Sequence, residues 1–260
     1  MEDPHPARNQ GGPPSYYPLG ERVRGVAMPS DRRASQRGVP RAAPPRPGIA
    51  VGLDLAGSET RRTGFCRLDS HGRTETRVLG DDEEILNAVR KADPAVVSID
   101  APLFLPLGRP SIEARGPPHF RASDRILRRL GIRFFPITLG PMRSLTARGM
   151  RLKERLASEG FHSIEGYPGA GQDLLDIPRK GAGAAALRAG LVRCGLSGGI
   201  ESPETTHDEL DAASAAYLGN RFLAGDFVAI GDPREGWMIL APKQAVLDRL
   251  RGRPLVGRPG

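Results

Sequence analysis

The stretch GIAVGLDLAG (residues 48–57) is an apolar run that contains Asp54 near its end and closes on a glycine. A short apolar run bounded by turn residues predicts a buried β-strand. Two alternating segments follow, TGFCRLD (63–69) and TETRVLG (74–80), each bounded by Gly or Asp. Alternation of apolar and polar residues predicts strands with one buried face, so we expect these three strands to pair antiparallel.

The next two segments extend this order of elements. DDEEILNAVRKA (81–92) begins with acidic residues and places Ile85 and Val89 on one face. This pattern predicts an amphipathic helix. DPAVVSID (93–100) is again an apolar run, and it ends in Asp100. The order up to this point is therefore three strands, a helix and a fourth strand.

A later segment, THDELDAASAAY (206–217), predicts a helix with an acidic first turn, in which Thr206 and Glu209 form a capping-box pattern. The predicted order is three strands, a helix, a strand and a later acidic helix. This is the element order of a ribonuclease-H-like fold. This is an α/β fold with a mixed sheet, in which three antiparallel strands are followed by parallel strands with helices. Its first and fourth strands are neighbours, so we expect Asp54 and Asp100 to lie side by side.

The rest of the chain is expected to complete one domain over residues 49–260. A Pro-rich connection follows residue 100, and helices are predicted at 122–131 and 143–160. We interpret the region around 101–160 as a helical insertion into the fold. Further elements are predicted in this order: a strand at 161–168, helices at 183–195 and 206–224, and strands at 226–232 and 236–242.

The first 48 residues differ in composition from the rest. They are dense in Pro, Gly, Ser and Arg and have no sustained apolar period. Such a segment cannot bury enough apolar surface to offset its conformational entropy, so we predict a disordered N-terminal tail over 1–48. The tail lacks the apolar centre of a signal peptide, and no run elsewhere approaches the length of a membrane span. We therefore expect a cytoplasmic protein that does not enter a membrane.

The formal net charge of the chain is +8. Residues 1–48 hold eight Arg and four acidic residues, so this segment supplies +4 of that total. The remaining part is only mildly basic, and its charge permits nucleic acid as a partner without indicating it. Cys66 and Cys194 stand alone in the sequence, which excludes a zinc-binding cysteine motif and a disulfide framework.

Four aspartates form the candidate site. Asp54 and Asp100 end neighbouring strands, and Asp208 and Asp211 lie three residues apart on one helix face. Carboxylates that converge in this way repel one another, and a divalent cation removes that cost. Oxygen ligands without a His or Cys cluster favour Mg²⁺ or Mn²⁺. Two such ions activate a water and stabilise the leaving oxygen of a phosphodiester, so these aspartates are candidate catalytic residues and metal ligands.

Each aspartate also has a structural explanation. Asp54 and Asp100 can be turn residues that end strands, and Asp208 and Asp211 can be first-turn acids that suit the helix dipole. Glu165 at the end of FHSIE is a further candidate metal ligand, although glutamate at a strand end is common.

Arginines near the start of the predicted helix at 122–131 are candidates for substrate binding. Arg121, Arg125 and Arg128 recur at helical spacing and can follow a phosphate backbone. The alternative is a solvated surface in an Arg-rich protein. Aromatic residues make up 5% of the chain, which argues against an extended platform for stacking single-stranded bases.

The chain resembles the DUF429 family of predicted nucleases over roughly residues 49–242. The segments that carry the resemblance occur in the family's order: VGLDLAG (51–57), VVSIDAPL (96–103), RASDRILRRLGI (121–132), IEGYPGA (164–170) and HDELDAASAAY (207–217). The resemblance implies a ribonuclease-H-like fold with acidic site residues at Asp54, Asp100 and Asp211, together with Asp208. Holliday-junction resolvases of the RuvC type look similar in the late helix. Ser123 stands where many relatives have a cysteine, so no thiol role carries over.

Two other function classes compete with a nuclease. The turn GLDLAGSETRRTG (52–64) is similar to the phosphate-binding turn of sugar kinases of the actin-like superfamily, which predicts ATP-dependent phosphotransfer. Such enzymes need two domains of this type, and the chain length supplies one. The third class is a nucleic-acid-binding module without catalysis, which would bind without regard to Mg²⁺. The sequence leaves the oligomeric state open.

Overall fold

The computed structural model describes residues 26–27 and 48–252. Its elements follow the chain in this order: β1 (Val26–Ala27), β2 (Ala50–Asp54), β3 (Thr63–Leu68), β4 (Arg73–Leu79), α1 (Asp82–Ala92), β5 (Val96–Ile99), α2 (Ala122–Arg129), α3 (Gly140–Ser158), β6 (Ser163–Gly166), α4 (Pro168–Leu174), η2 (Lys180–Ala182), α5 (Ala184–Arg193), β7 (Ser197–Gly198), η3 (Gly199–Glu201), α6 (His207–Leu223), β8 (Val228–Asp232), β9 (Gly236–Leu240) and α7 (Lys243–Leu250).

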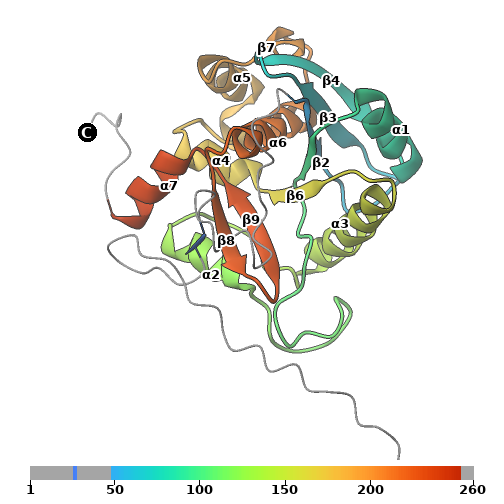
Figure 1. Ribbon diagram of the computed structural model, residues 1–260, viewed down its shortest axis with the longest axis vertical. Helices are drawn as coiled ribbons and strands as arrows, with labels where there is room; N and C mark the ends of the chain where they lie inside the picture. The colour runs from blue at the N-terminus through green and yellow to red at the C-terminus, as the bar shows by residue number, and fades with distance from the viewer. Residues whose placement is uncertain (1–25, 28–47, 253–260) are drawn as a thin grey trace, which may run out of the picture.

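The strands form one sheet with the order β1-β8-β9-β6-β5-β2-β3-β4-β7 (Figure 1). β2, β3 and β4 pair antiparallel, whereas β5 pairs parallel with β2, and β6 pairs parallel with β5. The central order β4-β3-β2-β5-β6 is that of a ribonuclease-H-like sheet. The predicted fold class is therefore confirmed, and so is the adjacency of the first and fourth predicted strands, β2 and β5.

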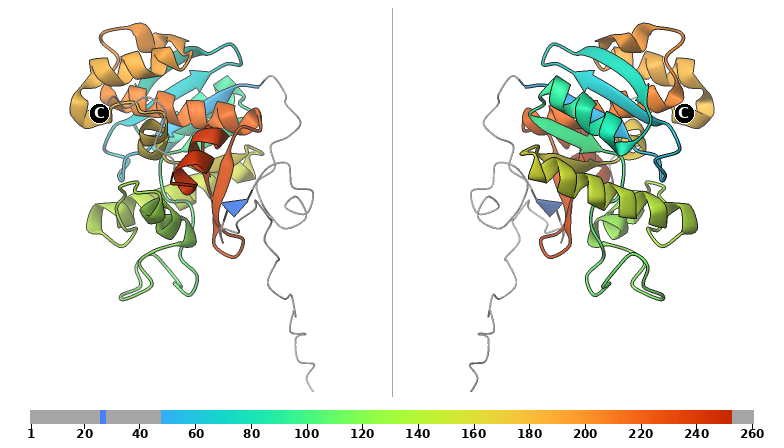
Figure 2. Two further views of the ribbon diagram at one scale, coloured as in Figure 1. Left: turned by 90° about the vertical axis from the view of Figure 1, so that its left-hand side faces the viewer. Right: turned by 90° about the vertical axis from the view of Figure 1, so that its right-hand side faces the viewer.

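Helices cover both faces of the sheet (Figure 2). Side chains alternate along β2, as the pleat of a strand requires. Val51 and Leu53 join the apolar cluster that α1 and α3 complete, whereas Ala50 joins the cluster on the opposite face with Leu218 and Phe222 of α6. The strand is buried on both faces, which explains why its sequence is a continuous apolar run.

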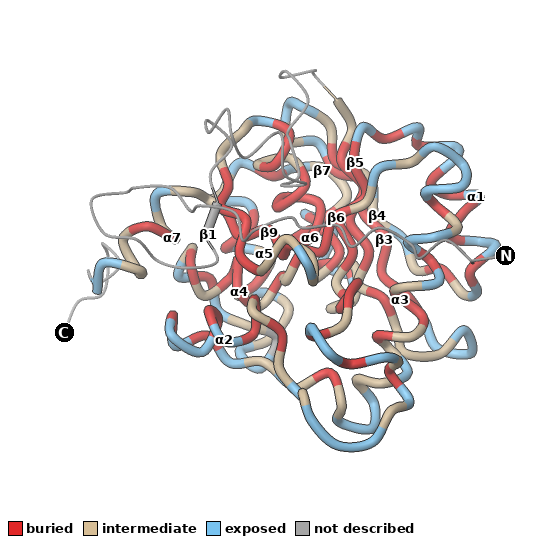
Figure 3. The backbone as a smooth tube through the Cα atoms, turned by 60° about the horizontal axis from the view of Figure 1, so that its bottom comes forward, coloured by how far each residue is buried: buried red, intermediate tan, exposed pale blue. Residues whose placement is uncertain are grey.

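Helix α6 lies unusually close to the sheet. A Cβ atom added at Gly52 of β2 would stand 2.0 Å from the carbonyl oxygen of Ala212, and one added at Gly64 of β3 would stand 2.0 Å from that of Asp208. The backbone of α6 therefore rests directly on two strands where they carry no side chain. Figure 3 shows much of this helix as buried.

Part of the N-terminal segment joins the sheet. Val26–Ala27 form β1 and pair antiparallel with β8. At these two residues the structure differs from the predicted tail, because backbone pairing at a strand edge needs no apolar face. Residues 1–25 and 28–47 lie outside the described residues, so their disorder stays a prediction.

Two helices were not expected from the sequence, α4 and α7. The segment PGAGQDL that forms α4 is rich in glycine, which lowers helix propensity. Together with α2, these helices pack on β8 and β9 around Ile126, Leu174, Ile230 and Val246. Among the described residues, none of the helices is long and apolar enough to span a membrane.

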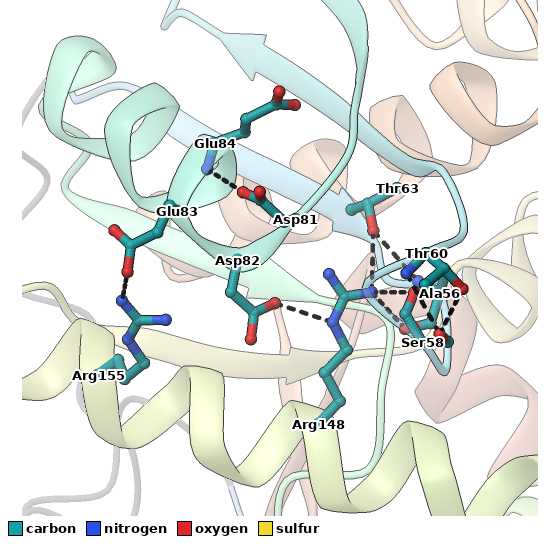
Figure 4. Close-up of polar contacts among 10 residues, drawn as sticks. All are labelled: Ala56, Ser58, Thr60, Thr63, Asp81, Asp82, Glu83, Glu84, Arg148 and Arg155. Atoms are coloured by element: carbon teal, nitrogen blue, oxygen red, sulfur yellow. Dashed lines mark hydrogen bonds and ion pairs between the residues drawn. The ribbon is translucent and has the colours of Figure 1, made fainter.

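A buried arginine, Arg148 of α3, connects three segments on the α1–α3 face (Figure 4). Its Nε donates to Oδ1 of Asp82 at 2.8 Å, and its Nη1 donates to the carbonyl oxygens of Ala56 and Ser58 at 2.8 and 2.9 Å. Arg148 is 1% exposed. Burying an arginine is costly unless it is paired, and these contacts supply the pairing while holding the turn after β2 in place.

We expect Arg148→Ala to destabilise the protein by about 3–5 kcal/mol, because it leaves Asp82 as an unpaired buried charge. Urea denaturation measures the loss. The matched control is Arg155→Ala, since Arg155 also joins α3 to α1, through Glu83, but at the surface (Figure 4). Water screens that pair, so its removal should cost far less.

The double variant Arg148→Met with Asp82→Leu should recover part of the lost stability, because no charge then remains buried. Equal losses in Arg148→Ala and Arg155→Ala would show that the buried pair has no special weight.

Candidate functional site

Two of the four aspartates lie at one edge of the sheet. Asp54 is the last residue of β2, and Asp100 directly follows β5. The two strands pair in parallel, with Leu53 opposite Ile99, and the Asp100 N–H donates to the Leu53 carbonyl at 2.8 Å. Both aspartates are partly exposed. The sheet register therefore brings their backbones together at the carboxyl ends of neighbouring strands.

Helix α6 brings the other two aspartates to the same edge. Its first turn is capped as predicted: the Glu209 N–H donates to Oγ1 of Thr206 at 3.3 Å, and the Thr206 N–H donates to Oε2 of Glu209 at 2.9 Å. This capping box accounts for Glu209. It does not account for Asp208, whose carbonyl lies against Gly64, the residue paired with Asp54 across β2 and β3.

The aspartates divide between two cavities. The first, which we call the arginine cavity, has a volume of about 440 Å³, and its walls include Asp54, Asp208, Arg61 and Arg62. The second, which we call the aromatic cavity, has a volume of about 370 Å³, and its walls include Asp100, Asp211, Phe134, Phe135 and Tyr167. Met142 and Leu145 of α3 line both. The cavities are therefore neighbours that share a wall.

Asp54 and Asp208 line one cavity and Asp100 and Asp211 line the other, and the convergence of the four carboxylates on one metal site stays a prediction. Over residues 26–27 and 48–252, no three His, Cys, Asp or Glu side chains are grouped so that they could hold a metal ion. The donor set nevertheless fits Mg²⁺ or Mn²⁺, since every candidate ligand is a carboxylate oxygen of a residue that lines one of the two cavities. The assignment of the four aspartates as ligands stays a prediction.

Asp211 is positioned by a residue that sequence reasoning missed. Nε2 of Gln172 in α4 donates to Oδ1 of Asp211 at 2.9 Å and to Oγ of Ser214 at 3.1 Å. Gln172 is buried, and its amide fixes which way the carboxylate turns. The glycine-rich segment that forms α4 carried no signal for this contact, because the contact joins residues 39 positions apart.

Glu165 belongs to a buried ionic triad. Its Oε2 accepts from the Leu103 N–H and from Nη1 of Arg121, both at 2.8 Å, and Nη2 of Arg121 donates to Oδ1 of Asp124 at 2.9 Å. Burial raises the pKa of Glu165, and the Arg121 guanidinium opposes that rise. The triad holds two carboxyl groups against one guanidinium, and its three residues line the aromatic cavity. The role of Glu165 as a metal ligand stays a prediction.

The prediction that Arg121 belongs to a surface stripe of arginines is wrong. This residue is 2% exposed, and as the N-cap residue of α2 it donates its backbone N–H to Oδ2 of Asp124 at 2.9 Å. Ion pairing with two carboxylates holds the guanidinium inside the fold. Arg125 and Arg128 are exposed as expected, and the Arg128 guanidinium lies over the Phe120 ring, 4.5 Å from its centroid.

No protein-family model matches this sequence, and no curated protein matches it significantly. Similar solved structures include RuvC of T. thermophilus in complex with a Holliday junction substrate, with 12% identity and a TM-score of 0.41 over 66% of this chain and 94% of that chain. The Thermus thermophilus RuvC structure has 14% identity and a TM-score of 0.37 over 68% of this chain and 96% of that chain. The strand order identifies the fold independently of this likeness.

We expect Gly64→Ala to displace the start of α6, because the new Cβ would collide with the Asp208 carbonyl. The loss of stability should be about 1–3 kcal/mol, as for an overpacked core. Thermal and urea unfolding measure it. Gly181→Ala is the control, since open space surrounds that position and its backbone is unstrained. Equal stability of both variants would show that α6 is not fixed by this contact.

Proposed function

We propose that this protein is a metal-dependent hydrolase of phosphodiester bonds in nucleic acids. The observation that carries the proposal is the placement of two aspartate pairs, Asp54 with Asp208 and Asp100 with Asp211, on neighbouring cavities at one sheet edge. The cap of α6 is formed by Thr206 and Glu209, so the capping box does not require Asp208 or Asp211.

The charges of the arginine cavity support a phosphate ligand together with a cation. Arg61 and Arg62 are exposed and line the same cavity as Asp54 and Asp208. A phosphodiester there would meet guanidinium donors on one side and carboxylates on the other. The carboxylates would repel the phosphate unless a cation lay between them.

The residues have separate roles in this proposal. Asp54, Asp100, Asp208 and Asp211 supply oxygen ligands, and Gln172 keeps the carboxylate of Asp211 turned toward the site. When bound, Mg²⁺ or Mn²⁺ supplies a Lewis acid that lowers the pKa of water and stabilises the leaving oxygen. Arg61 and Arg62 hold the phosphate, and Arg125 and Arg128 on α2 offer further charge to the nucleic-acid backbone.

A cleavage screen tests the proposal directly. Labelled DNA and RNA in single-stranded, duplex and branched forms are incubated with Mg²⁺, Mn²⁺ or EDTA. We expect cleavage that needs the divalent ion and is lost in Asp54→Asn. Binding without cleavage, at an affinity that ignores Mg²⁺, would favour a non-catalytic binding module. ADP release that depends on a small alcohol would favour the phosphotransferase.

Asp211→Asn should uncouple stability from activity. Cleavage should fall by orders of magnitude, because a neutral amide is a poor ligand for Mg²⁺. In EDTA the melting temperature should stay equal or rise slightly, since carboxylate repulsion is relieved. Added Mg²⁺ should raise the melting temperature of the wild type more than that of the variant, because an ion bound to the native state stabilises it. Asp208→Asn should show the same pattern more weakly.

Glu209→Ala is the matched control on the same helix turn. It removes the capping box, so it should lower the melting temperature equally with EDTA and with Mg²⁺. If Mg²⁺ shifted wild type and Asp211→Asn by the same amount, the metal site would be refuted.

A further inference from the structure

Contacts with neighbouring residues orient two rings of the aromatic cavity. The Phe134 ring meets the Phe120 ring edge to face, with 6.1 Å between centroids and 85° between planes. The Tyr167 hydroxyl donates to the Arg133 carbonyl at 2.6 Å. The Phe134 and Tyr167 rings line the cavity. A flat ligand that enters would therefore meet apolar ring surfaces whose orientation is set before it binds.

Phe135 differs from the other rings of this cavity. Its side chain is 68% exposed, the highest value among the large hydrophobic side chains of the described residues. It nevertheless counts among the cavity-lining residues. An aromatic ring exposed to this extent at the mouth of a cavity offers a face on which a second flat ring can stack.

The polar part of the cavity is rich in acceptor atoms. Asp100, Asp211 and the triad carboxylates of Asp124 and Glu165 line it. Its donors are Arg121, Gln172 and Arg179, and the four carboxylates outnumber the two guanidinium groups. Carboxylates accept hydrogen bonds and repel anions. A flat ring that carries N–H donors therefore fits this cavity.

We propose that the aromatic cavity receives one unstacked nucleobase of the substrate strand, stacked on Phe135 and donating an exocyclic amino group to the Asp124 and Glu165 carboxylates, which leaves Asp100 and Asp211 to the metal ion. This inference rests on the proposed nuclease function and names the form of its substrate. The cavity volume of about 370 Å³ lies within the range of small-molecule sites. The shared wall of Met142 and Leu145 places the backbone of that nucleotide next to the arginine cavity.

The substrate then needs a base that leaves its stack at low cost. Unpaired, mismatched or single-stranded positions meet this condition, whereas a paired base in a duplex must first be unpaired. Adenine, guanine and cytosine carry an exocyclic amino group and thymine does not. A nucleic acid with a single bulged adenine is therefore expected to bind better than the same duplex with a bulged thymine.

The test is a double-mutant cycle between the protein and the base. Fluorescence anisotropy measures binding of four DNA duplexes: fully paired, with a bulged adenine, with a bulged thymine, and with an abasic bulge. All proteins carry Asp54→Asn, so that cleavage does not consume the DNA. Phe135→Ala is compared with Leu139→Ala, which truncates another exposed apolar side chain of the same α2–α3 connection.

We expect Phe135→Ala to weaken binding of the adenine bulge about ten-fold, as for loss of one base–aromatic stack. It should leave the abasic bulge unchanged, because the ring then has no base to stack on. Leu139→Ala should bind all four duplexes as the Asp54→Asn parent does. Equal losses for adenine and abasic bulges, or equal affinity of the parent for both, would overturn the inference.

The outcome for the base site can be told apart from the outcome for the proposed nuclease function. Coupling between Phe135 and the bulged base, in a protein whose wild type cleaves nothing, would leave the base site standing and refute the nuclease. Cleavage by wild type with no dependence on the base would refute the base site alone. Failure of all four duplexes to bind would overturn the inference.

Discussion

The contact of α6 with the sheet at Gly52 and Gly64 is the constraint on which the site depends. At both positions a helix carbonyl lies where a side chain would otherwise begin. The helix backbone can approach the strands this closely only because glycine has no Cβ atom. This approach carries Asp208 next to the end of β2, so the distance between the helix acids and the strand acids is set by backbone contact and not by flexible side chains.

Interior arginines hold the connections that the sheet itself does not fix. Arg148 joins α3 to α1 and to the turn after β2, and Arg121 joins α2 to β6. Each lies among carboxylates and carbonyl groups, which offset the cost of removing a guanidinium from water. Both connections border a cavity of the candidate site. In the formal net charge these two arginines count like any surface arginine. Their guanidinium groups are buried and paired inside the fold, so they are not available to a nucleic acid.

The two cavities divide the site by chemistry. The arginine cavity combines cationic and acidic side chains, which suits a phosphate with a divalent ion. The aromatic cavity combines rings with acceptor oxygens, which suits a base. A nucleotide consists of a phosphate and a base that are joined by a sugar. The wall that the cavities share therefore matches the division of the proposed substrate, with one strand acid and one helix acid on each side of it.

The sequence by itself determined the order of most helices and strands, though not β1, α4, β7 and α7, and the strand ends at which Asp54 and Asp100 lie, because apolar periodicity and turn residues are local properties of the chain. It also determined the cap of α6. Tertiary structure decided the rest. The pairing of Gln172 with Asp211, the burial of Arg121 and the separation of four aspartates into two cavities all join residues distant in the chain. Local patterns carry no information on such contacts, since the residues that meet lie far apart in the sequence.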